Sequence, residues 1–127
     1  METLKSGYPV KTHKQPIKRF CQTLELKNDS TLITEYKYWH DKNNRWPEIP
    51  EGISSVGILD LEIYIQGNLL FMIVETPLDF EWDTAFGILA TLDRQAEWED
   101  FMAKFQLTKP GASSAEKWTL MERIFSL

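Results

Sequence analysis

The sequence predicts a single α+β domain in which an antiparallel four-stranded sheet carries helices on one face. A length of 127 residues suits one hydrophobic core. Hydrophobic residues at 43% and charged residues at 26% are values typical of a globular protein. Segments that alternate with a period of 2 are interleaved with segments that repeat about every 3.6 residues, in the order strand, helix, strand, strand, helix, strand. This order is what predicts the α+β class.

The first 16 residues, METLKSGYPVKTHKQP, are predicted to form a flexible N-terminal extension outside the core. They are polar, contain Pro9 and Pro16, and show neither period. His13 lies in this extension, and we expect its ring to be solvated. The remaining residues, 17–127, form the predicted domain.

The first half of the domain predicts a strand and two helices. Residues 17–26, IKRFCQTLEL, alternate as a strand does, and Asp29 or Ser30 suits the N-cap of the helix that follows. Trp46 and Pro47 suit the start of a second, short helix that ends near Gly57. The first helix carries four residues whose spacing places them on one face: Leu32, Ile33, Tyr36 and His40.

The second half predicts two paired strands, two helical segments and a last strand. Residues 58–65, ILDLEIYI, alternate strictly, Gly67-Asn68 is a hairpin signal, and LLFMIVET is apolar throughout. A helix is expected from an Asp79 cap, followed by a break near residues 91–94 and a second segment reaching residue 105. Residues 117–125, KWTLMERIF, are predicted as the fourth strand.

This element order is the ferredoxin-like split βαβ arrangement, with helices on one face of the sheet. The apolar third strand predicts that the other face is covered too. A second copy of the chain supplies that cover most simply, so we expect a homodimer of the dimeric α+β barrel type.

Composition argues against several functional classes. A formal net charge of −5, with no basic stripe, argues against nucleic acid as a partner. Cys21 is the single cysteine and cannot form an internal disulfide, and no signal peptide or membrane-spanning apolar run is seen. We therefore expect a cytoplasmic protein that does not bind membranes. No HxxH, HxH or CxxC spacing supports a metal site, and no nucleophile motif is present.

Tyr36 and His40 are the candidate chemical pair, because residues four apart on a helix are neighbours one turn apart. A histidine, with a reference pKa of about 6.5, can both accept and donate a proton at neutral pH. The residues alone leave open the alternative that His40 only satisfies a backbone carbonyl. Trp98 and the adjacent Glu99 offer a stacking surface and a hydroxyl ligand for a sugar, although a tryptophan at helical spacing is more often core.

Six segments together resemble the L-rhamnose mutarotase family of small dimeric aldose 1-epimerases. They are EYKYWH (35–40), RWPEIPEGI (45–53), GILDLEIYI (57–65), NLLFMIVE (68–75), QAEWEDFM (95–102) and LMERIF (120–125). The resemblance implies exchange of the α and β anomers of a 6-deoxyhexose such as L-rhamnose or L-fucose. It also implies that no cofactor is needed.

The resemblance further implies site roles for four residues. His40 would be the catalytic proton donor, and Tyr36 and Trp98 would contact the sugar. Glu99 would be a substrate contact at a position where the family has a second aromatic residue. Leu61 falls where the family has a tyrosine, so the preferred sugar is left open.

Two other functions fit the same architecture. One is a non-enzymatic sugar sensor or regulatory protein that binds through the same residues. The other is a dimeric α+β barrel monooxygenase, because a shared fold does not determine the chemistry.

Overall fold

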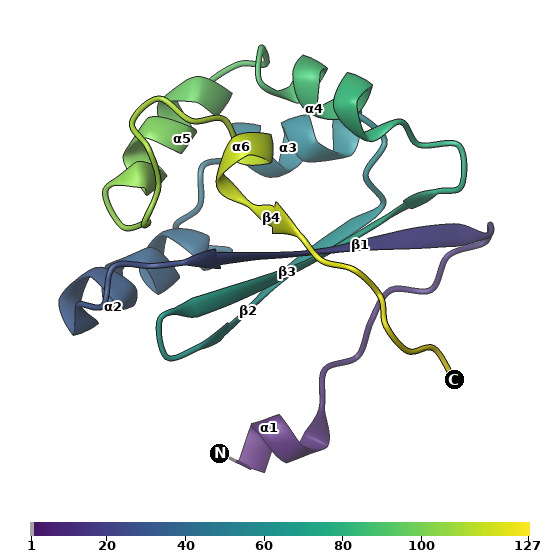
Figure 1. Cartoon of the computed structure of the whole chain (residues 1–127), viewed down its shortest axis with the longest axis horizontal. Coiled ribbons are helices and arrows are strands. Elements are labelled where there is room, and N and C mark those ends of the chain that lie inside the picture. The colour runs from purple at the N-terminus through teal and green to yellow at the C-terminus, as the bar shows by residue number, and fades with distance from the viewer. Residues whose placement is uncertain (1) are drawn as a thin grey trace.

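The computed structural model describes residues 2–127 and confirms the predicted ferredoxin-like α+β architecture (Figure 1). Four strands form one antiparallel sheet in the order β2-β3-β1-β4. The strands are β1 (Ile17–Glu25), β2 (Asp60–Gln66), β3 (Leu69–Pro77) and β4 (Thr119–Leu120). The helices are α1 (Glu2–Ser6), α2 (Ser30–His40), α3 (Glu48–Ser55), α4 (Trp82–Leu89), α5 (Gln95–Ala103) and α6 (Ser114–Lys117).

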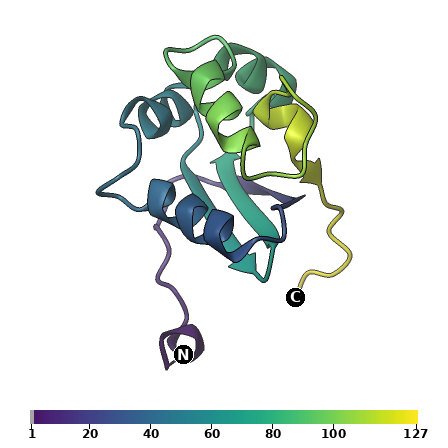
Figure 2. The ribbon, with the colours of Figure 1, turned by 90° about the vertical axis from the view of Figure 1, so that its left-hand side faces the viewer.

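Helices α3 to α6 lie over one face of the sheet, and α2 packs at one end of the same layer (Figures 1 and 2). On β3, Leu70, Met72 and Val74 are buried beneath this layer, as expected from strand alternation. Strand β1 places Leu24 beside Leu70, and β2 places Ile63 beside Met72. The core therefore sits between the sheet and the helices.

The cap of α2 and the β2–β3 turn form as predicted. The Asp29 carboxylate accepts a hydrogen bond from the Leu32 backbone N–H at 3.0 Å, and Asp29 is the N-cap. Gly67 has a φ of +61°, which a glycine in a two-residue hairpin turn adopts without strain.

The predicted Asp79 cap is wrong: α4 begins at Trp82 with Glu81 at the N-cap position. The Phe80 N–H donates to the Pro77 carbonyl at 3.2 Å, and this turn keeps Asp79 outside the helix. The break before α5 is confirmed. Arg94 lies there with a φ of 62°, the one described non-glycine residue with positive φ.

The fourth strand is much shorter than the predicted residues 117–125. Residues Ser114–Lys117 form α6 behind a capping box made by Ser113 and Glu116, so the strand begins only at Thr119. It pairs with Gln22 and Thr23 of β1, and after Met121 the chain leaves the sheet. Ile124 is 90% exposed and Phe125 is 77% exposed, so the described part of the chain leaves both side chains largely uncovered.

The N-terminal segment lies on the side of the sheet away from the helical layer (Figures 1 and 2). Tyr8 meets Tyr64 edge to face with ring centroids 5.7 Å apart, and Lys11 pairs with Asp60 at 3.2 Å. The His13 side chain is 13% exposed and its Nε2 lies 2.9 Å from Glu75 Oε1. The expectation of a solvated His13 is therefore wrong.

No helix among residues 2–127 combines the length and apolar character needed to cross a membrane.

Candidate functional site

A cavity of about 470 Å³ opens between the sheet and the helical layer. Its walls come from elements that are far apart in the sequence. The lining side chains most relevant to chemistry are Tyr36 and His40 of α2, Leu61 of β2, Gln95, Trp98 and Glu99 of α5, and Gln106. A cavity with apolar and aromatic walls and a few convergent polar groups is typical of a small-molecule site.

His40 has a defined tautomer in this cavity. Its Nδ1 lies 2.7 Å from the Tyr36 carbonyl oxygen. Because a carbonyl only accepts, Nδ1 carries the proton and Nε2 holds a lone pair in the neutral ring. None of the described residues offers Nε2 a hydrogen-bond partner. Burial lowers the pKa of His40 from 6.5, and the bond to the Tyr36 carbonyl opposes this only in part. The resting side chain at neutral pH is thus a neutral base.

Tyr36 lies against His40 with ring centroids 4.2 Å apart, as the one-turn spacing predicts. Burial raises the pKa of its hydroxyl, which therefore stays protonated and remains a hydrogen-bond donor. The hydroxyl oxygen lies 3.4 Å from Gln106 Nε2, the donor in this contact. The sequence thus correctly placed Tyr36 and His40 side by side.

Gln106 is a cavity residue that the sequence interpretation missed. It is buried, and its Oε1 has no hydrogen-bond partner among the described residues. A buried unpaired acceptor beside a cavity is suited to receive a ligand hydroxyl. No local pattern identifies this glutamine, because it follows α5 and is placed by an isolated antiparallel bridge to Leu26, just after β1.

Trp98 forms part of an aromatic wall next to His40. Its ring meets His40 edge to face at 5.4 Å and Trp46 at 5.1 Å. Trp46 in turn stacks on Phe101 with an interplanar angle of 4°. Trp98 is buried and also lines the cavity, so it belongs both to the core and to the site.

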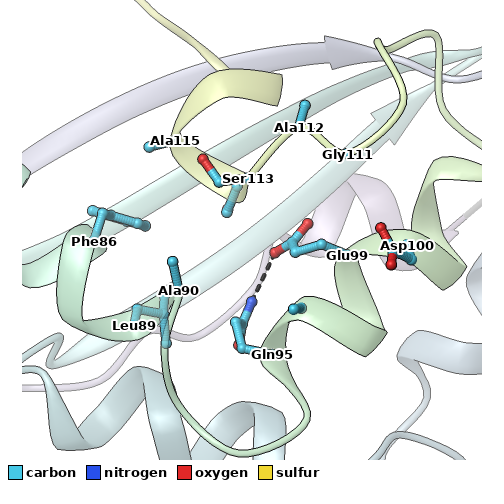
Figure 3. Close-up of a pocket in the computed structure, with 12 residues that line it drawn as sticks. Phe86, Leu89, Ala90, Gln95, Glu99, Asp100, Gly111, Ala112, Ser113 and Ala115 are labelled. Carbon is cyan, nitrogen blue, oxygen red and sulfur yellow. Dashed lines mark hydrogen bonds between the residues drawn. The ribbon is translucent and has the colours of Figure 1, made fainter.

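Glu99 lines the same cavity and is held by two neighbours. Lys117 Nζ lies 2.9 Å from Glu99 Oε1, and Gln95 Nε2 donates to Oε2 at 2.7 Å. Figure 3 shows the Gln95 bond and a smaller adjacent cavity of about 210 Å³, which Gln95 and Glu99 also line. Glu99 thus lines both cavities. The sequence interpretation missed Lys117 because it assigned that residue to the fourth strand.

The other residues singled out in the sequence offer no polar group to the cavity or lie away from it. Leu61 lines the cavity from β2 and presents only a hydrocarbon side chain there. His13 is paired with Glu75, whose parity on β3 places it on the outer face of the sheet. Within residues 2–127, no group of three or more His, Cys, Asp or Glu side chains is arranged to hold a metal ion.

Comparisons with known proteins point to one family. The family model for L-rhamnose mutarotase matches residues 19–127. An L-fucose mutarotase from Xanthomonas campestris pv. campestris is 34% identical over 87% of this chain and 89% of its own length. A UPF0734 protein from Dictyostelium discoideum is 36% identical over 87% of this chain and 90% of its own.

A crystal structure of an L-rhamnose mutarotase from Formosa agariphila shares the fold. Its TM-score is 0.66 at 24% sequence identity, and the match covers 87% of this chain and 98% of that one. The extent of the family match and the identity to the curated relatives lead to one conclusion: this chain belongs to the L-rhamnose mutarotase family.

Proposed function

We propose that this protein is a mutarotase that exchanges the α and β anomers of a 6-deoxyhexose such as L-rhamnose or L-fucose. The observation that carries the proposal is the state of His40. It is a neutral imidazole in a sugar-sized cavity, with Nδ1 fixed by a carbonyl and Nε2 without a partner among residues 2–127. Family membership and the curated L-fucose mutarotase relative support the same class of reaction.

The reaction needs one proton to move between two oxygens on the same carbon. His40 Nε2 takes the proton from the anomeric hydroxyl and then gives it to the ring oxygen, so that the C1–O5 bond breaks and the open-chain aldehyde forms. Rotation about C1–C2 and the reverse transfers close the ring on its other face. One positioned acid/base of this kind contributes about 10²- to 10⁴-fold. In this proposal His40 accepts before it donates, which refines the role expected from the sequence.

The other cavity residues bind and orient the sugar. The protonated Tyr36 hydroxyl donates a hydrogen bond to a sugar oxygen, and the unpaired Gln106 Oε1 accepts one. Trp98 offers a flat apolar surface to the C–H face or to the 6-methyl group. Glu99 is proposed as a hydroxyl acceptor. No resident cofactor has a part in this scheme.

We also propose that the protein is a cytoplasmic homodimer. The exposed Ile124 and Phe125 in the C-terminal segment suit burial against a second copy. Analytical ultracentrifugation should give twice the monomer mass, and removal of residues 122–127 should shift the equilibrium toward monomer. A monomer at micromolar concentration would contradict the dimer. The unpaired thiol of Cys21 suits a reducing compartment.

Magnetisation-exchange NMR at the anomeric protons tests the proposed activity directly. Catalytic amounts of protein should accelerate α–β exchange of L-rhamnose or L-fucose above the spontaneous rate, and boiled protein should not. Sugar binding without acceleration would instead indicate the sensor function. Absence of both binding and acceleration with either sugar would contradict the proposal.

A further inference from the structure

The Lys117 ammonium is the most deeply buried cation that the described residues hold in an ion pair. Its side chain is 0% exposed, whereas the lysine and arginine side chains in the other ion pairs of the described residues are at least 35% exposed. Lys117 reaches both the carboxylate and the backbone carbonyl of Glu99. A buried charge is tolerated only where it is paired and hydrogen-bonded, so Lys117 and Glu99 form a unit.

Glu99 is fixed in orientation by this unit. Lys117 occupies Oε1 and Gln95 occupies Oε2, so the carboxylate is held from both ends. Gln95 is itself buried and lies one helical turn before Glu99 on α5. With both oxygens restrained, the position of the carboxylate in the cavity wall is set before any ligand binds.

The restrained carboxylate keeps capacity to bind a ligand. A carboxylate offers about four lone-pair positions, two on each oxygen. Each oxygen accepts one protein hydrogen bond, which leaves a second position on each. Two adjacent acceptors on one rigid group match two hydroxyls on neighbouring carbons, and a pyranose presents such vicinal pairs.

We propose that Lys117 is a positioning residue that holds Glu99 as the acceptor for two adjacent hydroxyls of the sugar, and so sets the specificity of the cavity. This inference rests on the proposed mutarotase function, because the adjacent hydroxyls belong to the sugar that is proposed to bind in the same cavity. Hydrogen bonds to a charged acceptor contribute enough that loss of one sugar hydroxyl lowers affinity by about tenfold to a hundredfold. The substrate class is a neutral pyranose with a free vicinal diol.

The test measures every variant with every sugar. The sugars are L-rhamnose, L-fucose and their monodeoxy analogues that lack one ring hydroxyl. The variants are Glu99→Gln, Lys117→Met, Lys117→Arg and the double variant Glu99→Gln/Lys117→Met. Lys104→Met is the matched control, because Lys104 pairs with Glu35 at 3.5 Å in an exposed ion pair away from the cavity. KM and kcat come from anomer exchange, and Kd from saturation-difference NMR.

The wild type should discriminate against at least one monodeoxy analogue by about tenfold or more. Lys117→Met and Glu99→Gln should each raise KM by a similar factor, change kcat little, and abolish that discrimination. The double variant should be no worse than either single one, because Lys117 acts through Glu99. Lys117→Arg should restore part of the discrimination, and Lys104→Met should match the wild type.

Three results overturn the inference. One is a folded Lys117→Met variant that keeps the KM and the sugar discrimination of the wild type. In that case the proposed mutarotase function still stands, provided that the wild-type protein accelerates anomer exchange. If Lys117→Met does not fold, retained discrimination in Glu99→Gln is equally decisive. A wild type that binds no sugar overturns both proposals. Binding without exchange, with discrimination that depends on Glu99 and Lys117, removes the mutarotase function and retains the diol site.

Discussion

The two histidines of the chain lie on opposite faces of the sheet and show what determines a proton-transfer role. His40 uses Nδ1 to donate to a carbonyl, and its Nε2, at the cavity wall, has no partner in the described part of the chain. His13 places its Nε2 2.9 Å from the Glu75 carboxylate on the outer face. The same side chain is thus prepared for chemistry in one place and bound in a structural cluster in the other.

The surroundings of the two rings differ in the same way. His40 lies among Tyr36 and Trp98, and burial lowers its pKa so that the ring is neutral. His13 joins Arg19 at Glu75, where the Arg19 hydrogen bond, followed by that of His13, lowers the pKa of the carboxyl. Aromatic neighbours that keep the imidazole neutral suit a reversible proton carrier, whereas an ionic cluster suits anchoring of a segment.

Removal of one aromatic ring from each face should separate core packing from surface packing. Trp98→Ala is expected to lower the free energy of unfolding by about 3–5 kcal/mol and to abolish sugar binding. Tyr8→Ala, on the outer face, removes the edge-to-face contact of a half-exposed ring with Tyr64 and should cost about 0.5 kcal/mol. Urea denaturation of both variants checks this, and equal losses would contradict the assignment of the faces.

The pH dependence should report His40 and not His13. Because His40 acts first as a base and burial lowers its pKa, exchange should be constant above pH 6.5 and decrease only at lower pH. Below the folded-state pKa the rate should fall about tenfold per pH unit. The same pKa shift predicts that stability decreases as pH falls from 6.5 to that lower pKa, since the unfolded chain binds the proton more readily. A rate that increases on acidification would contradict a neutral base.

Glu75→Gln should weaken the outer face and leave the chemistry unchanged. The loss of its hydrogen bonds with Arg19 and His13 should reduce the free energy of unfolding by about 1–3 kcal/mol at pH 7, toward the lower end because Arg19 is exposed. In the wild type this contribution is present above pH 4.5 and is lost as pH falls through the lowered folded-state pKa. Thermal unfolding and anomer exchange measured together check the prediction; a matching loss of kcat would place Glu75 in the mechanism.

The smallest effect is expected from removal of residues 1–12. This deletion takes away the Tyr8–Tyr64 contact and the ion pair of the exposed Lys11 with the largely buried Asp60, and retains His13. We expect a change in unfolding free energy below about 1 kcal/mol, in line with the division of the chain at residue 16. Calorimetry of the truncated protein is the measurement. Loss of cooperative unfolding would show instead that the segment is part of the core.

Most of the fold could be predicted from local sequence patterns. The alternation of the first two strands, the Asp29 cap and the Gly67-Asn68 turn each depend on neighbouring residues, and all three form as predicted. The same holds for Tyr36 and His40, because helical spacing alone brings their rings together. The cavity could be predicted only through the family resemblance, because the residues of its opposite walls are far apart in the sequence and meet only in the tertiary fold.

The predictions that were wrong depended on distant partners. The fourth strand ends early because β1 pairs with it at only two residues. The alternation of apolar residues in the sequence does not indicate how far two strands will pair. Lys117 resembles a surface residue in sequence, and only its partner 18 residues earlier makes it a buried one. His13 was misjudged for the same reason, because Glu75 is 62 residues away.

Anomeric exchange by His40→Asn and His13→Asn, compared with the wild type, tests the central claim most directly. Magnetisation-exchange NMR with L-rhamnose and L-fucose should show a loss of about 10²- to 10⁴-fold for His40→Asn, with sugar binding retained. His13→Asn should keep the wild-type rate. Full exchange by a folded His40→Asn, or an equal loss in both variants, would contradict the assignment of proton transfer to His40.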